Sequence, residues 1–289
     1  ELLERPDARR EKILMLDLAV EVIQYRYASR ELEKSAYRKQ LLAALGARSQ
    51  LGRLDTDWQE NVPVPPRPEL GHDSKRASAG FGVQSGDAFV EARFRPALTD
   101  LTDMDYIPHQ GAQIEFGDLR TRYYPESRRL ALQQFDIIDI VSIAPVGPFS
   151  KPLSWKFNTG WHRKPLENDA DASYFRLNGG AGLSGRLPLF GLAYFMAEAE
   201  FDISGDMPAD YALGGGAAVG TVLSAGRACK IHLYGRGLRF FAGGRHSDLS
   251  AGVLGNFRIS RNHHLSLEGR WEDAGDARCQ ISALWHWFF

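Results

Sequence analysis

The sequence predicts an all-β fold, a transmembrane antiparallel β-barrel of about twelve strands that follows an α-helical hairpin and a Pro-rich linker. Three observations predict this fold. Beyond about residue 75, apolar and polar residues alternate with a period of two over segments of strand length. Most of the 29 glycines come after Gly80. The last segment is rich in aromatic residues and ends at Phe289, which resembles the assembly signal of outer-membrane proteins.

The composition excludes several classes of function. A net charge of -1 and a pI near 6.8 provide no basic surface for nucleic acid, so no nucleic-acid partner is expected. The mean hydropathy is -0.32 and no apolar run approaches about 18 residues, so no transmembrane helix is expected. Cys229 and Cys279 lack zinc-ligand spacing, and no nucleotide or coenzyme motif stands out. We therefore expect no metal and no cofactor.

The chain divides into three parts. Residues 1–50 are expected to form a periplasmic helical hairpin, because apolar residues from Ile13 to Ile23 recur at helical spacing and a second helix is indicated over residues 30–45. Residues 51–74 are rich in proline and are expected to be extended, either as a linker or as a segment that lines the lumen. Residues 75–289 are assigned to the outer-membrane barrel.

The alternating segments number about twelve, and an even number is typical of bacterial barrels. The connection from Leu98 to Gln110 is long for a periplasmic turn, and the alternation slips near Gln133, which predicts a bulge. The expected strands begin near residues 77, 88, 111, 128, 153, 173, 191, 209, 227, 248, 262 and 277.

Alternation alone also fits a soluble β-sandwich or lipocalin-like barrel, in which the apolar face turns inward. The apolar face here has little bulk for a shared core, and the terminal aromatic strand favours the membrane form, in which the charged face lines the lumen. Mixed charges in so narrow a barrel predict ion-paired ladders rather than a conduction path. The expected lumen-lining charged residues are Glu91, Arg93, Arg95, Glu198, Glu200, Lys230, His232, Arg236, Glu268 and Arg270.

Part of the inner wall is almost without side chains. Small residues at such positions allow another backbone, a ligand or long side chains to approach closely. Two occupants remain open: the chain's own segment from about Leu51 to His72, or the Arg and Tyr side chains opposite. The small inner-wall residues are Gly180, Gly182, Gly214, Gly216 and Gly220.

Aromatic residues gather near the strand ends, where a membrane barrel carries its girdles. They predict contact with outer-membrane lipids, and the last strand predicts recognition by the barrel-assembly machinery. These girdle and terminal residues are Trp155, Trp161, Trp271, Trp285, Trp287 and Phe289.

His72-Asp73-Ser74 resembles the His-x-Ser element of outer-membrane phospholipase A, another barrel of twelve strands, in which His activates Ser. That resemblance implies a lipid hydrolase with His72 and Ser74 as catalytic residues. The sequence departs from the pattern because Lys75-Arg76 replaces the Asn-Gly that follows in those lipases. The alternative is a turn leading into the first strand, with His72 and Ser74 capping backbone groups.

Several adjacent stretches resemble one Gram-negative family. They are Gly71–Arg76, Arg95–Ala97 with Asp100-Leu101, Gly111–Phe116, Asp139–Ile143 and Ser154–Lys156. Members of that family join a papain-like periplasmic domain, related to the Lnb lipoprotein N-acyltransferases, to a terminal barrel. The resemblance implies that the catalytic Cys and His lie upstream of this sequence, which itself opens without a secretory signal.

Neither cysteine fits a catalytic role, because both Cys229 and Cys279 fall on the lipid-facing side of their strands. They also fall near opposite ends of those strands, so no disulfide between them is expected.

The sequence thus favours a barrel in the bacterial outer membrane, with its N-terminal segment in the periplasm. It would anchor an upstream Lnb-like enzyme domain and present lipid or lipoprotein substrate to it. The alternatives are a lipid hydrolase that uses His72 and Ser74, and a narrow solute channel.

Overall fold

The computed structural model describes residues 8–52, 71–104, 111–165, 171–188, 191–207, 209–226 and 228–289. The chain divides into two compact units, Glu1–Val64 and Pro65–Phe289. The first unit is helical and the second is a β-barrel.

The helical unit is an antiparallel hairpin of α1 (Ala8–Ala28) and α2 (Lys34–Ser49), as the sequence predicted. Ile13 and Ala44 are buried between the two helices. At one end of the hairpin the rings of Tyr27 and Tyr37 stack with their centroids 4.1 Å apart.

In the residues that the structure describes, the second unit contains thirteen strands in one sheet. Their bounds are β1 (Arg76–Gln84), β2 (Asp87–Arg95), β3 (Ala97–Thr99), β4 (Ala112–Tyr124), β5 (Arg129–Ser142), β6 (Ser154–Pro165), β7 (Asp171–Leu187), β8 (Gly191–Ile203), β9 (Tyr211–Ala225), β10 (Cys229–Gly243), β11 (Ser247–Arg258), β12 (His263–Asp273) and β13 (Ala277–Phe288).

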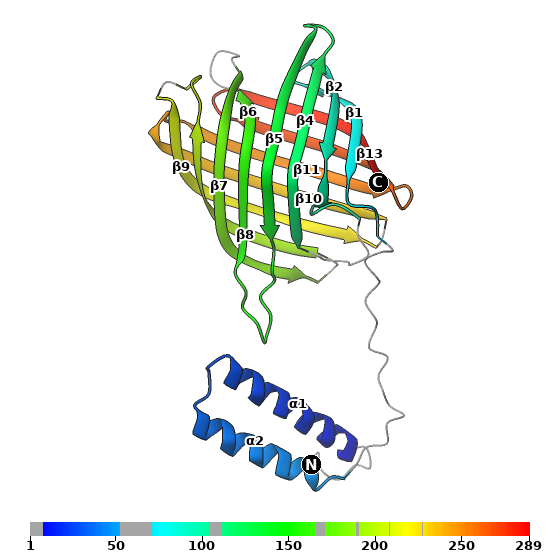
Figure 1. Ribbon diagram of the computed structural model, residues 1–289, viewed down its shortest axis with the longest axis vertical. Helices are drawn as coiled ribbons and strands as arrows, with labels where there is room; N and C mark the ends of the chain where they lie inside the picture. Colours follow the sequence, from blue (N-terminus) through cyan, green and yellow to red (C-terminus); the bar gives the residue numbers. More distant parts are fainter. Residues whose placement is uncertain are drawn as a thin grey trace. The chain divides into compact units, whose positions relative to one another are not determined.

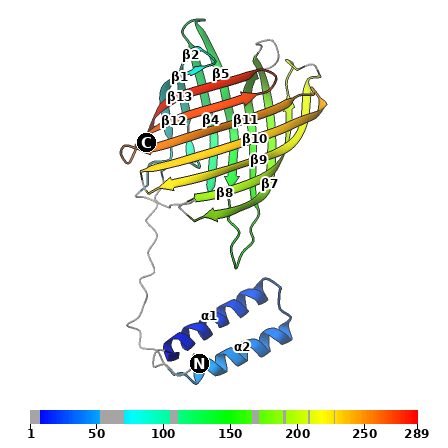
Figure 2. The ribbon, with the colours of Figure 1, turned by 180° about the vertical axis from the view of Figure 1, so that it is seen from behind.

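The sheet closes on itself. β1 pairs with β13 along its whole length, from Arg76 opposite Phe288 to Gln84 opposite Gln280. β2 and the short β3 are consecutive pieces of one wall strand, since both pair with β4, so the barrel has twelve antiparallel strands. Figures 1 and 2 show β4 to β8 on one wall and β9 to β13 crossing behind them at a steep inclination. A closed antiparallel sheet leaves no unpaired edge.

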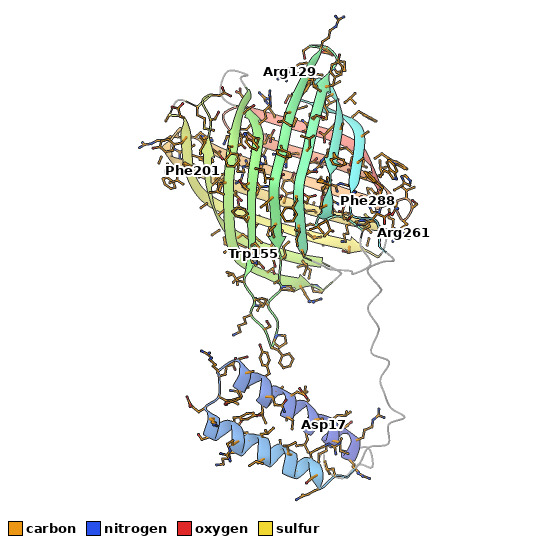
Figure 3. The ribbon with its side chains drawn as sticks, in the orientation of Figure 1. Asp17, Arg129, Trp155, Phe201, Arg261 and Phe288 are labelled. Carbon is orange, nitrogen blue, oxygen red and sulfur yellow. The ribbon has the colours of Figure 1, made fainter. Side chains whose placement is uncertain are left out.

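The direction of the side chains agrees with a membrane barrel. Phe81, Leu130 and Ile281 are 69 to 74% exposed on the outer surface. Asp136 and Asp202, by contrast, are at most 1% exposed. A soluble barrel would show the reverse, because water would solvate the charges and the apolar groups would fill the interior. The predicted fold class is therefore confirmed, and side chains project from both faces of the wall in Figure 3.

The strands begin within two residues of their expected positions. The bulge predicted near Gln133 is also present: Arg120 pairs with Gln134 and Thr121 with Leu132, which leaves Gln133 as the extra residue. The sequence did not predict β3 as a separate strand. A bend at Pro96 interrupts the wall strand there, because proline cannot donate a ladder hydrogen bond.

Two ends of the barrel are distinguished below. The terminal end holds the start of β1 and the end of β13, and an even number of strands brings both to the same side. The distal end holds the turns that join β1 to β2, β4 to β5 and β12 to β13.

Candidate functional site

The lumen contains rows of charged side chains. The structure places all ten charged residues that the sequence assigned to the lumen on the inner faces of their strands, where Arg95 is 0% and Glu200 1% exposed. Each charged row follows from the period of two, which sends alternate residues of a strand to the same face.

Most of these charges are paired across strands. Arg122 donates to Glu91 at 2.7 Å. Glu198 accepts from Lys156 at 2.7 Å and from Arg236 at 2.8 Å. Such pairing lets a narrow interior hold many charges, because each carboxylate retains hydrogen-bond donors after leaving bulk water.

The terminal end of the lumen is occupied by Asp100–Met104, here called the floor segment. It follows β3, turns into the barrel and is buried: Leu101 is 5%, Thr102 2%, Asp103 0% and Met104 2% exposed. A connection on the outside of a barrel would be solvated, so this burial identifies an internal element.

Asp103 makes the main ionic contacts between the floor segment and the wall. Arg76 Nη1 donates to its Oδ1 at 3.0 Å and Arg95 Nη2 donates to its Oδ2 at 2.5 Å. Arg95 Nη1 also donates to Glu115 Oε1 at 2.8 Å. Burial alone would raise the pKa of Asp103, but the charges of Arg95 and Arg76 outweigh it and hold that pKa below its usual value. Asp103 is therefore an ionised carboxylate between two guanidinium groups.

The opposite walls also hold the floor segment. Asn256 Nδ2 on β11 donates to the carbonyl oxygen of Thr102 at 3.0 Å, and Lys230 Nζ on β10 donates to that of Asp103 at 2.5 Å. Leu101 packs in an apolar cluster with Leu192 and Met196 of β8, Val222 of β9 and Ile143, which follows β5. The floor segment thus bridges the barrel and closes its terminal end.

Above the floor segment lies a cavity of about 350 Å³, here called the well. Leu101 lies at its base, and Gln84, Asp248 and Arg278 line it near the distal end. A cavity of this size and polarity is within the range of small-molecule sites.

The small inner wall is covered by the barrel's own aromatic side chains. A methyl group on Gly220 would lie 2.5 Å from the hydroxyl of Tyr194, and one on Gly214 would lie 2.8 Å from the ring of Phe240. Methyl groups on Gly180, Gly182 and Gly216 would be crowded by the adjacent strands. The covering side chains are therefore Tyr194 and Phe240 of the neighbouring strands β8 and β10, rather than Arg and Tyr side chains from across the lumen. Most of the alternative segment, residues 53–70, lies outside the described residues.

His72 and Ser74 do not form a hydrogen-bonded pair in the part of the chain that the structure describes. The His72 ring packs on Phe288 with a centroid distance of 4.1 Å, and its Nδ1 lies 2.7 Å from the carbonyl oxygen of Asp73. Ser74 is exposed. Of the turn hypothesis, the structure shows the contact of His72 with a backbone oxygen, while Asn262 donates to the Asp73 side chain at 2.7 Å.

The region that forms the barrel matches a known family. The model of a domain of unknown function (DUF7840) matches residues 65–288, which is more than half of the chain. The chain belongs to the DUF7840 family. No curated protein matches it significantly.

Several solved barrels are similar to the DUF7840 chain. The KdgM porin is 5% identical, with a TM-score of 0.40, and covers 74% of this chain and 99% of its own. Omp33 of Acinetobacter baumannii is 10% identical, with a TM-score of 0.39, and covers 76% and 99%. OmpT of Vibrio cholerae is 9% identical, with a TM-score of 0.37, and covers 74% and 96%. Likeness at this level concerns the barrel architecture and does not extend to ligands.

Five tryptophans in the described strands of the DUF7840 chain are exposed, and they lie toward both ends of the barrel. Trp155, Trp285 and Trp287 lie toward the terminal end and are 42 to 50% exposed. Trp161 and Trp271 lie toward the distal end, at 45% and 38%. Two aromatic belts on an apolar outer surface are typical of a barrel that spans a membrane. Of the labelled residues in Figure 3, Trp155 belongs to these belts, whereas Phe288 is buried in the lumen.

The two cysteines of the DUF7840 chain are free thiols, Cys229 half-buried and Cys279 exposed. Within the described residues, no helix is both long and apolar enough to cross a membrane, and no three His, Cys, Asp or Glu side chains cluster as metal ligands would.

The functional element that sequence analysis missed is the floor segment. The long connection from Leu98 to Gln110 was its only signal, and residues 105–110 of that connection lie outside the described residues. The charged partners Asp100 and Asp103 look like ordinary turn residues in the sequence.

Proposed function

We propose that this barrel anchors a periplasmic enzyme domain in the bacterial outer membrane, with the terminal end toward the periplasm. The enzyme domain would be the upstream papain-like, Lnb-like domain that the sequence resemblance implies. The barrel would present lipid or lipoprotein substrate to it.

The closed terminal end is the observation that carries this proposal. An open pore needs a continuous aqueous path, whereas Asp103 is fully buried between Arg76 and Arg95 and ties the floor segment to the wall. Ion pairs fill much of the remaining interior. A barrel filled in this way supports a holding role better than a transport role.

The orientation is supported by the position of the chain's ends. β1 begins and β13 ends at the terminal side, and the helical unit precedes β1 in the sequence, so a periplasmic terminal end would keep the helical unit in the same compartment as an upstream domain. The distal turns would then face the cell exterior.

Two measurements test the anchor. Cells that produce the natural full-length protein without residues 65–289 should release the hairpin-containing remainder into the soluble periplasmic fraction, whereas the intact protein should stay with the outer membrane. If the shortened protein remains membrane-bound, the barrel is not the anchor. Purified barrel in planar lipid bilayers should show no discrete conductance steps, and steady unit conductances would favour the channel instead.

The narrow channel is retained as a second candidate because the well extends from Leu101 of the floor segment to residues near the distal end, such as Asp248. Conduction would require displacement of the floor segment. Because Asp103 holds that segment in place, the conductance of such a channel would change when Asp103 is replaced.

A further inference from the structure

We propose that the well is a binding site for a small hydroxylated anion, such as a sugar acid or a sugar phosphate, with Arg120 as its principal charged contact. This inference does not depend on the anchor proposal, because a closed barrel and a conducting one could both contain such a site.

The surface of the well is more positive than the lumen as a whole. Nine basic and four acidic side chains line it, all within the described residues. The difference arises because several carboxylates that neutralise these cations lie against the wall, behind them: Glu91 is 2%, Glu200 1% and Asp202 0% exposed. Lysine and arginine side chains are longer than aspartate and glutamate, so their charged ends reach further into the lumen. Basic groups therefore outnumber acidic groups on the surface that a bound solute would contact.

Arg120 is only weakly neutralised, since the carboxylate oxygen facing it lies 3.5 Å away. Its cross-strand neighbours are Arg93 on β2 and Gln134 on β5, and neither is an acid. Like charges directly opposite each other destabilise a sheet. The arrangement of Arg93 and Arg120 is thus one that folding alone would not favour, which is the usual sign of a functional position.

The nearest carboxylate to Arg120 is already engaged. Glu91 Oε2 accepts from Arg122 at 2.7 Å, whereas Glu91 Oε1 lies 3.5 Å from Arg120 Nε, too far for more than a weak pairing. Asp118 on the neighbouring row is held by Arg93 at 3.0 Å. Arg93, Arg120 and Arg122 therefore surround Glu91 and Asp118, and Glu268 on β12 adds a further negative charge near Arg120. An anion in the well would be an additional partner for Arg120. Arginine also binds carboxylates and phosphates through two parallel hydrogen bonds.

The rest of the lining suits hydroxyl groups. Gln84, Gln133, Gln280 and Asn178 present side-chain amides, and Tyr234 also lines the well. Amides both donate and accept, so they can satisfy hydroxyl groups in more than one orientation. The volume of about 350 Å³ accommodates a molecule of monosaccharide size, although not a polymer.

The test is isothermal titration calorimetry of the purified chain in detergent micelles with three probes of equal ring size: glucuronate, glucose and glucosamine. We expect glucuronate to bind at least about tenfold more tightly than glucose, which is the effect of one charge-assisted contact, and glucosamine to bind no better than glucose. Equal affinities, or no heat with glucuronate, would overturn the proposal without the need for any variant.

A matched pair of variants locates the site. Arg120→Gln should lower the affinity for glucuronate about tenfold or more while leaving weak glucose binding unchanged. The control is Arg239→Gln, since Arg239 is on the exposed face of β10 and donates to Ser247 at 2.8 Å. Unchanged glucuronate affinity in a folded Arg120→Gln barrel would move the site elsewhere. If that variant fails to fold, the discrimination among the three probes by the unmodified chain still decides whether the well prefers anions.

Discussion

Replacing Asp103 by Asn tests whether the floor segment is held by charge. The side chain keeps its size, but Arg76 and Arg95 lose the buried carboxylate that lies 3.0 and 2.5 Å from them. Removing one partner of a buried ion pair costs about 3–5 kcal/mol. Glu115 still lies 2.8 Å from Arg95 and 3.5 Å from Arg76, so we take the lower value, about 3 kcal/mol. The floor segment should then leave its place about 150-fold more often, since 1.4 kcal/mol is a factor of ten.

The assay is maleimide labelling of Thr102→Cys in a background where Cys229 and Cys279 are replaced by Ser. Thr102 is 2% exposed, so labelling requires displacement of the floor segment. We expect the rate to rise by about two orders of magnitude with Asp103→Asn, from the free energy above. The control is Asp73→Asn at the same end, because Asp73 is 47% exposed and its pair with Arg261 spans 4.0 Å. Equal labelling rates with and without Asp103→Asn, in barrels that keep their folded gel mobility, would refute the reasoning.

Three further predictions concern pH, packing and catalysis. Because the pKa of Asp103 is held below its usual value, the ionised side chain stabilises the fold fully above about pH 4, and this contribution is lost as the pH falls further. Hydrogen exchange of the floor segment, corrected for the intrinsic exchange rate, should show constant protection from pH 5 to 7. The protection should decline only in stronger acid. Gly182→Ala should destabilise the barrel by about 1–3 kcal/mol in urea unfolding, because the methyl group would overlap backbone of β8, whereas Gly185→Ala should be neutral, since nothing lies within 4 Å of its added methyl group. Ser74→Ala should leave any phospholipid hydrolysis by the purified chain unchanged, and a loss of release would restore the lipase hypothesis.

The barrel itself was predictable because its determinants are local. Each strand's own sequence shows alternation with a period of two. The interruption of this alternation at Gln133 indicates the bulge without any knowledge of the strand that pairs with it. The direction of the faces followed from the small bulk of the apolar face and from the terminal aromatic strand, and the burial of Glu91 and Glu200 agrees with it.

The floor segment was not predictable, because its determinants are distant. Thr102 and Asp103 contact Asn256 and Lys230, which lie 154 and 127 residues further along the chain. No local period distinguishes such a segment from a solvated turn. The same holds for Arg120: its charge was visible, but the like-charged neighbour that makes it unusual appears only once the register of β2 and β4 is fixed.

The polar interior also constrains how the barrel can be made. Arg122 on β4 donates to Gln280 on β13 at 2.8 Å, and Ser78 on β1 lies 2.6 Å from His286 on β13. β1 and β4, which are synthesised early, therefore form some of their side-chain hydrogen bonds only with β13, the last strand. Until β13 arrives, an unfinished sheet would expose its polar concave side, and hydrocarbon could not solvate it. Insertion into lipid one strand at a time is thus disfavoured. The unfinished sheet needs an aqueous environment that is shielded from lipid until β1 pairs with β13.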